Sequence, residues 1–393
     1  MAVRLLAYEV ADLCLGKPPL RSLSSSATVA DALSALKSSD DSFISVWSCD
    51  HSGSLECECV CVGKVCMVDI ICHLCRDENL SSPSLALKSP ISVLLPEVKG
   101  SVRHVKPSSS LLEAIDLILE GAQNLVVPIK SGSTSNTRRK QLQKLSSSIA
   151  PTIHNGQEFC WLTQEDVIRF LFSSIGLFSQ IATLSIDALG IISTEFFAVE
   201  YHRPASSAIK AISCSLLNQT SVAVVDEDGT LVGEISPFLL SCCDEKVAAA
   251  VMTLSAGDLM AYIDCGGLPE EVMKVVESRL KERNLKGMLN EFMISPCDGD
   301  ISNSSYDEEL PSPTTPLSRS GRYSRSSSHS ARMLRQAEAI VCHPGSSLVA
   351  VMIQAITHRV NYVWVIEDDC SVVGIVTFAN MLEVFRENLE CMI

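Results

Sequence analysis

Hydrophobic and polar positions follow their most regular pattern near the C-terminus, in residues 346–388. Apolar residues first recur every three or four positions, which is the spacing of a helix that buries one face. Two short β-rich runs follow, Tyr362–Ile366 and 372–376, joined by a polar turn. Thr377 then stands at a favoured N-cap position, ahead of a second amphipathic stretch. The segment predicts the order helix, strand, strand, helix.

The same order recurs three more times along the chain. It begins at Thr28 in the first copy, near Val102 in the second and at Phe196 in the third. The third copy contains an Asp-Glu-Asp-Gly turn that is typical of a β-hairpin. Recurrence of one supersecondary unit indicates repeats that bury their hydrophobic faces against each other. We therefore predict an α+β fold of four β-α-β-β-α repeats.

Three segments interrupt these repeats. Residues 130–157 are polar and predict a long loop inserted into the second hairpin. Residues 244–294 predict a helical insertion, and residues 295–334, rich in Ser, Pro and Arg, predict a disordered loop. Ser-Pro, Thr-Pro and Arg-x-x-Ser patterns in this loop indicate a phosphoprotein, with a plain solvated linker as the alternative. The predicted repeats then span residues 10–76, 88–175, 176–243 and 335–390.

Composition limits the class of protein. The chain has 393 residues, of which 47% are hydrophobic and 20% charged, as in globular proteins. A net charge of -15 argues against nucleic-acid binding, which needs clustered Lys and Arg. The N-terminus does not resemble a signal or transit peptide, so we expect a cytoplasmic or nuclear protein. Residues 170–186 are mostly apolar but contain several Ser and Thr, which favours one buried helix over a membrane span.

Cysteine is unusually frequent, with 17 residues. A disulfide framework is not expected without a secretory signal, and free thiols pack as small hydrophobic side chains. Cys57, Cys59 and Cys61 alternate along the chain, which places them on one face of a strand. A core strand is the main prediction. Redox-sensitive thiols and a metal site are the alternatives, although no paired Cys-x2-Cys knuckles are present and we expect no resident metal.

The repeat resembles the CBS domain, named after cystathionine β-synthase. The resemblance lies in the order of elements, a Gly in the second hairpin strand, and a Ser/Thr-x-x-Asp-like start of the last helix. In that family two copies pack through their sheets into a Bateman module, so the resemblance implies two modules here. The layout, with Leu-x-Leu-Gly-Lys-Pro-Pro-Leu near the start, resembles plant proteins of the CBSX group and the γ subunit of AMP-activated protein kinase.

The resemblance also implies where a ligand would bind. In nucleotide-binding members the Asp of Ser/Thr-x-x-Asp accepts hydrogen bonds from both ribose hydroxyls, and the helix start faces phosphate. The matching pairs at this helix start are, in chain order, Cys66 and Asp69, Thr163 and Asp166, Ser236 and Leu239, and Thr377 and Asn380. The implied ligand-binding residues are Asp69, Thr163, Asp166, Thr377 and Asn380, with Asp69 and Asp166 as the better pair. Alternatively these residues only cap their helices.

The function implied by the resemblance is regulatory. No nucleophile elbow, P-loop, dinucleotide fingerprint or zinc-protease motif is present in the sequence, so we predict no enzyme activity. We expect a protein that binds an adenosine-containing ligand through paired repeats and modulates a partner. AMP, ADP, ATP and S-adenosylmethionine are the candidate ligands, with no cofactor required.

A kinase complex or a thioredoxin-type enzyme is the expected partner, and a homodimer is compatible with the family's pairing of modules. The alternative function is an interaction scaffold with degenerate ligand sites, motivated by the departures from the family pattern at Cys66, Leu239 and Asn380.

Overall fold

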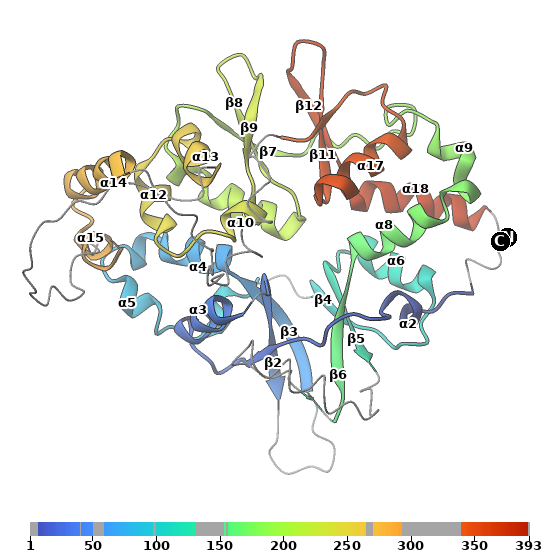
Figure 1. The fold of residues 1–393 in the computed structure, drawn as a ribbon, viewed down its shortest axis with the longest axis horizontal. Coiled ribbons are helices and arrows are strands. Elements are labelled where there is room, and N and C mark those ends of the chain that lie inside the picture. The colour runs from blue at the N-terminus through green and yellow to red at the C-terminus, as the bar shows by residue number, and fades with distance from the viewer. Residues whose placement is uncertain are drawn as a thin grey trace, which may run out of the picture.

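Four small sheets of the same construction form the molecule (Figure 1). The computed structural model describes residues 7–39, 41–49, 59–96, 100–129, 153–154, 156–264, 270–292 and 339–391. Each sheet has three strands, of which the first pairs parallel and the third antiparallel with the middle one. The predicted α+β fold of four β-α-β-β-α repeats is confirmed.

The repeats use the following strands and helices. The first contains β1 (Ser22–Ser24), α3 (Val29–Ser38), β2 (Phe43–Cys49), β3 (Cys59–Cys66) and α4 (Met67–Leu74). The second contains β4 (Val102–His104), α6 (Leu111–Leu119), β5 (Asn124–Ile129), β6 (Glu158–Thr163) and α8 (Gln164–Ser173). The third contains β7 (Phe197–Glu200), α10 (Ile209–Asn218), β8 (Val222–Val225), β9 (Leu231–Ile235) and α11 (Pro237–Leu240). The fourth contains β10 (Val341–Cys342), α17 (Leu348–His358), β11 (Tyr362–Ile366), β12 (Val372–Thr377) and α18 (Phe378–Glu390).

Shorter elements connect the repeats. The helices are α2 (Val10–Leu13), α5 (Pro83–Ala86), α9 (Ser179–Ala182), α12 (Val247–Thr253), α13 (Ala256–Asp264), α14 (Glu270–Glu282) and α15 (Lys286–Phe292). The 3-10 turns are η1 (Asp77–Asn79), η2 (Ile91–Leu94), η3 (Ile175–Phe178) and η4 (Ala205–Ala208). The described part of residues 244–294 is thus helical. The predicted loops at 130–157 and 295–334 lie outside the described residues, apart from residues 153–154 and 156–157.

Helix starts follow the capping chemistry of the sequence. The hydroxyls of Thr28, Ser110 and Ser347 accept the backbone N–H three residues later, at the first helix of their repeats. Such a cap satisfies a donor that has no partner inside the helix and contributes about 1 kcal/mol. The same cap thus recurs in three of the four repeats, whereas α10 of the third follows Ala208, which has no capping side chain.

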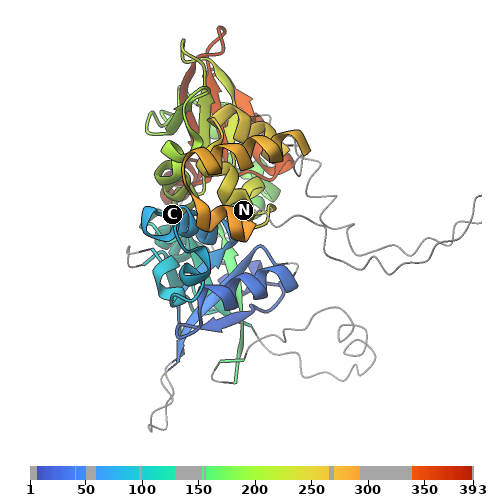
Figure 2. The same ribbon diagram turned by 90° about the vertical axis from the view of Figure 1, so that its left-hand side faces the viewer.

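Sheets pack face to face within each pair of repeats. In the first pair, Trp47, Cys61, Val126 and Phe159 form one buried cluster between the two hairpins. In the second pair, Glu234 of β9 binds side chains of β11, and Ser193 bridges to Ile375 of β12. The first two repeats fill one half of the molecule and the last two fill the other, in both views (Figures 1 and 2). The repeats are therefore arranged as two Bateman modules, each formed by two repeats.

Helices join the two modules. One hydrophobic cluster combines side chains of the first and third repeats, where α4 packs on α10 and α12. Another combines the second and fourth repeats, where α6 and α8 pack on α18. Both clusters consist mainly of buried aliphatic and aromatic side chains, whose burial is the main stabilising contribution to folding. The modules therefore share continuous cores.

Two local features differ from the pattern of the sequence. Residues 170–186, predicted as one buried helix, are divided among the end of α8, the 3-10 turn η3 and α9. The hydrogen bonds at the break are of short range. Ser173 Oγ donates to the carbonyl oxygen of Phe170 at 2.6 Å, and Leu177 N donates to that of Ser174 at 2.9 Å, which forms a 3-10 turn. Among the described residues, no helix has the length and apolar character needed to cross a membrane.

In addition, α2 packs on the second repeat, where Val10 N donates to Ser109 O at 2.9 Å.

Candidate functional site

The starts of the second helices of the first three repeats meet at one place. A cavity of about 230 Å³ lies there and receives residues from all four repeats. Cys66, Thr163 and Ser236, which precede the second helices of the first three repeats, line it together with Tyr362 of the fourth. The sequence positions that match the family motif are thus brought together in three of the four repeats.

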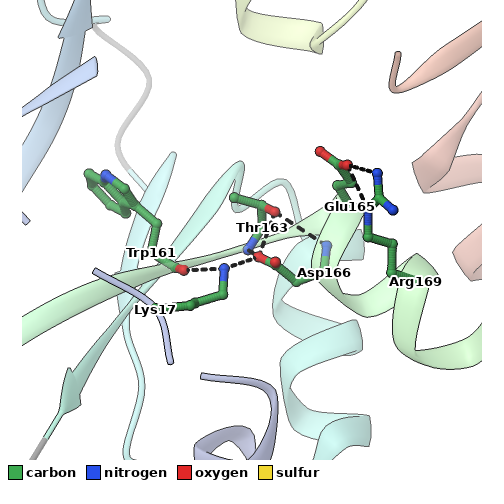
Figure 3. A network of polar contacts seen from close by, with 6 residues as sticks. All are labelled: Lys17, Trp161, Thr163, Glu165, Asp166 and Arg169. Carbon is green, nitrogen blue, oxygen red and sulfur yellow. Dashed lines mark hydrogen bonds and ion pairs between the residues drawn. The ribbon is translucent and has the colours of Figure 1, made fainter. Parts of the chain in front are cut away.

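Asp166, which belongs to the complete motif, is bound by its own chain (Figure 3). Asp166 Oδ2 accepts hydrogen bonds from the backbone N–H and the hydroxyl of Thr163, both at 2.7 Å. Lys17 Nζ also donates to Oδ2, at 2.5 Å, and to the carbonyl oxygen of Trp161 at 2.8 Å. Three donors therefore share one oxygen of the carboxylate.

Lys17 contacts this site, although the helix-start motif in the sequence does not indicate it. It is part of the Gly-Lys-Pro-Pro sequence near the N-terminus, 149 positions from Asp166. Spacing along the chain carries no signal for such a contact, because only the packing of α2 on the second repeat brings Lys17 to β6. The Lys17–Asp166 ion pair is partly buried, which screens it less than a surface pair.

Asp69 has a drier environment. Its Oδ2 accepts a hydrogen bond from the backbone N–H of Cys66 at 2.8 Å, which caps α4. Burial raises the pKa of the Asp69 carboxyl from its ordinary 3.8 to about 6, although the Cys66 N–H and the nearby Lys64 favour the charged form. Burial likewise raises the pKa of the Cys66 thiol well above its usual value. Burial therefore disfavours the charged form of both side chains at this helix start.

The raised pKa predicts a pH-dependent contribution of Asp69 to stability. The folded state holds the Asp69 proton more tightly than the unfolded state, so this stabilisation is complete below pH 3.8 and is lost as pH rises through about 6. Asp69→Asn cannot undergo this loss. We expect the variant to gain roughly 1–3 kcal/mol relative to the wild type between about pH 4.5 and about pH 7.5, measured by urea unfolding.

Asp31→Asn is the matched control, because Asp31 occupies the same capping position of α3. The backbone N–H and hydroxyl of Thr28 lower the pKa of Asp31, so its titration lies below this pH window. The difference in free energy of unfolding between Asp31→Asn and the wild type should be constant across the window. Parallel pH profiles for Asp69→Asn and the wild type would contradict the assignment.

Thr377 and Asn380 border a much larger cavity, of about 730 Å³. Asn380 Oδ1 accepts hydrogen bonds from the Thr377 backbone N–H at 3.0 Å and from its hydroxyl at 2.7 Å, which caps α18. Ser193 lies opposite, fixed by two backbone hydrogen bonds of 2.9 Å to Ile375. The cavity also receives residues of the second and third repeats, so it lies at the junction of both modules.

The charge of this cavity is negative. Glu195 and Glu383 border it, and none of the described residues that line it is Lys, Arg or His. Both carboxylates are exposed at the cavity rim, where they act through solvent. The cavity therefore favours a neutral or cationic ligand over a polyanion.

The remaining motif position does not offer a polar group. Leu239 is buried in the core, as its apolar side chain requires. Neither Asp69 nor Asp166 lines the two cavities described above or a third one of about 590 Å³ beside His343. Thr377 and Asn380 are therefore a motif pair in which both residues border a cavity, although the sequence pattern ranks them below the two aspartates.

Comparison with known proteins identifies the family. No family model matches the chain. The chain is 52% identical to the CBS domain-containing protein CBSX5 of Arabidopsis thaliana over 398 residues, which cover 99% of both proteins. The chain belongs to the CBS-domain proteins. This CBS-domain protein is also 27% identical to CBSX6 of the same plant over 425 residues, which cover 97% of the chain and 94% of CBSX6.

Two further likenesses concern the four-repeat layout. The CBS-domain protein is 24% identical to the Arabidopsis SNF1-related protein kinase regulatory subunit gamma-like PV42b, over 98% of the chain and 96% of that protein. Its fold is similar to the crystal structure of protein MJ1225 from Methanocaldococcus jannaschii, with a TM-score of 0.52 and 15% identity. That likeness covers 96% of this chain and all of the archaeal one, so it supports the arrangement of four repeats.

Proposed function

We propose that this CBS-domain protein is a non-catalytic regulator that binds an adenosine-containing ligand in the cavity beside Thr377 and Asn380. The cavity itself carries the proposal. Its volume of about 730 Å³ is in the usual range for small-molecule sites, and it contains the hydroxyl and amide at the start of α18. Apolar side chains such as Phe196 and Ile375 provide a surface for a flat base.

The negative charge of the cavity supports one ligand class over the others. Phosphates of AMP, ADP or ATP would lie close to Glu195 and Glu383 without a basic residue among the described lining side chains. S-Adenosylmethionine carries a sulfonium and an ammonium group, which complement these carboxylates. We therefore favour S-adenosylmethionine, or a related uncharged adenosine thioether, as the ligand.

The position of the cavity supports a regulatory role. Gln123 of the second repeat, Phe196 of the third and Thr377 of the fourth all border it. A ligand that contacts both modules favours the relative packing in which those contacts are made, which is a shift of population. A partner that recognises one packing would respond to the ligand. A kinase complex is the favoured partner, since a relative is named as a kinase regulatory subunit.

The experiment measures binding of S-adenosylmethionine, AMP, ADP and ATP by calorimetry and thermal shift. We expect S-adenosylmethionine to raise the melting temperature of the wild type, because it binds only the folded state. Asn380→Leu should remove this shift. Glu383→Gln should weaken S-adenosylmethionine by roughly fivefold and improve AMP binding, since it removes about 1 kcal/mol of charge interaction.

Lys17→Met is the control for the other motif. It frees Asp166 from its ion pair and leaves α18 unchanged, so it should not alter binding at the proposed cavity. If binding instead requires Asp166 and is unaffected by Asn380→Leu, the site belongs to the first module. If no ligand gives heat or a shift, the proposed function fails.

An interaction scaffold without ligand is the second candidate function. It is favoured by the Lys17–Asp166 ion pair, by the capping hydrogen bond of Asp69 and by the buried apolar Leu239, which occupy the last position of the motif in three repeats. A scaffold would bind its partner equally well with Asn380 or with Leu at position 380. Loss of partner binding in Asn380→Leu, with stability retained, would exclude this candidate.

A further inference from the structure

Two cysteines face each other at the end of the first hairpin. Cys49 is the last residue of β2 and Cys59 the first of β3, and the two are direct partners in the antiparallel register. Side chains of direct cross-strand partners lie on the same face of a sheet. Both cysteines are half-buried and neither forms a disulfide. The hairpin therefore presents two adjacent thiols on one side.

A histidine of the second repeat completes this group. His154 precedes β6, and its backbone forms two hydrogen bonds with Gln157. One ligand atom of each of Cys49, Cys59 and His154 lies within 4.8 Å of the others. The three residues come from two repeats and are brought together only by the packing of one sheet on the other.

The His154 ring is held in one orientation. Its Nδ1 lies 3.4 Å from Cys49 Sγ, and its Nε2 lies 3.0 Å from Ser22 Oγ. The ring is 8% exposed and stacks on the indole of Trp47, with centroids 3.8 Å apart and an angle of 11°. Metal-binding histidines characteristically direct one ring nitrogen to the metal and the other to an oxygen that fixes the tautomer. His154 has this arrangement, with Ser22 as the oxygen.

We propose that Cys49, Cys59 and His154 form a zinc-binding site. Thiolate and imidazole are the ligands that zinc prefers in proteins. Two thiolates with one imidazole are an established ligand set. Ligand atoms of tetrahedral zinc lie about 3.3–3.8 Å apart, as follows from its bond lengths. The observed 3.4 Å between Sγ and Nδ1 fits this value. The remaining separations need to contract by at most about 1.0–1.5 Å, and a fourth position stays open.

Zinc at this place would join the first and second repeats. Cys49 and Cys59 end the hairpin of one repeat, and β6 connects His154 to Thr163 of the other. The buried cluster of Trp47, Val126 and Phe159 lies beside it. A bound ion would hold the two sheets of the first module in register and add its binding free energy to folding. This role is independent of the ligand proposed for the cavity beside Asn380.

The test measures metal content and coordination in the full-length protein. Reduced protein purified with zinc present and without a polyhistidine tag should retain about one zinc per chain, measured by elemental mass spectrometry. Replacement of zinc by cobalt should give thiolate-to-cobalt charge-transfer absorption and the visible bands of a tetrahedral ion. Cys49→Ser, Cys59→Ser and His154→Ala should each lose both signals. A chelator should lower the melting temperature of the wild type but not that of these variants.

Cys370→Ser is the matched control, because Cys370 is an exposed cysteine at the hairpin of the fourth repeat. It should keep zinc, the cobalt spectrum and the response to chelator. The cobalt titration of the wild type keeps the proposal testable even if a variant fails to fold. Less than about a tenth of an equivalent of zinc, together with no cobalt–thiolate absorption, would overturn the proposal. Detection of a Cys49–Cys59 disulfide in freshly purified protein would also overturn it.

Discussion

Replacing Glu234 with alanine should lower the free energy of unfolding by about 3–5 kcal/mol, because two buried hydrogen-bond donors lose their acceptor, at roughly 1–3 kcal/mol each. The Glu234 side chain is 1% exposed and lies between the sheets of the third and fourth repeats. Its two oxygens accept hydrogen bonds from the Tyr362 hydroxyl and the Trp364 indole N–H, each at 2.8 Å. Removal of the carboxylate leaves both donors buried in an apolar interface, where each pays the cost of its lost hydration.

Urea unfolding followed by tryptophan fluorescence and circular dichroism measures this effect. Glu227→Ala is the control, because Glu227 is exposed at the turn of the same hairpin and should change stability by less than about 0.5 kcal/mol. Combining Glu234→Ala with Tyr362→Phe should cost less than the sum of the two single changes, since they share one hydrogen bond. Additive costs would mean that the network does not join the two repeats.

Replacing Gly374 with alanine should impair both stability and the proposed ligand site. Gly374 is the glycine of the second hairpin strand that the CBS resemblance predicts. A Cβ there would lie 2.6 Å from Ile192 Cγ2 and 2.6 Å from the carbonyl oxygen of Ser193. The backbone N–H and the carbonyl oxygen of Ser193 are both hydrogen-bonded to Ile375. Ser193 therefore cannot move away without breaking these bonds. We expect a loss of about 1–3 kcal/mol, which is the usual cost of overpacking.

The effect on binding follows from the same contact. Displacement of Ser193 would shift the wall of the cavity beside Asn380, so the thermal shift with S-adenosylmethionine should decrease along with stability. Gly345→Ala is the control, because a Cβ at Gly345 meets no atom within 4 Å. If Gly374→Ala unfolds at the same urea concentration as the wild type, the close approach of the two segments is not a constraint.

The fold could be predicted because its signal is local and repeated. Residues 346–388 carry helix and strand periods that depend only on neighbouring positions, and three other segments carry the same order. In residues 170–186 the hydrophobic pattern does not predict where the helix ends. The composition of this segment is mostly apolar, and the break beside Ser174 coincides with hydrogen bonds of Ser173 and Leu177 that a hydrophobic pattern does not describe.

The candidate sites depend on contacts between distant parts of the chain, which the sequence does not encode locally. The contact of Lys17 with Asp166 and that of His154 with Cys49 each cross from one repeat to a segment far away in sequence. The motif spacing correctly placed Thr377 and Asn380 at the start of a helix. It contained no information on the cavity beside them, because residues of two other repeats form its walls.

The position of α2 also determines how the protein can be divided. The second repeat is incomplete without residues that precede the first repeat, since Val10 and Cys14 fill its core and Leu20 N donates to Phe159 O. The first repeat is therefore enclosed within a loop of the chain whose two ends belong to the same core. A fragment that starts between the first two repeats would expose apolar surface on β5 and α8, which α2 contacts. No part of this chain smaller than a whole module, beginning with α2, is therefore expected to fold by itself.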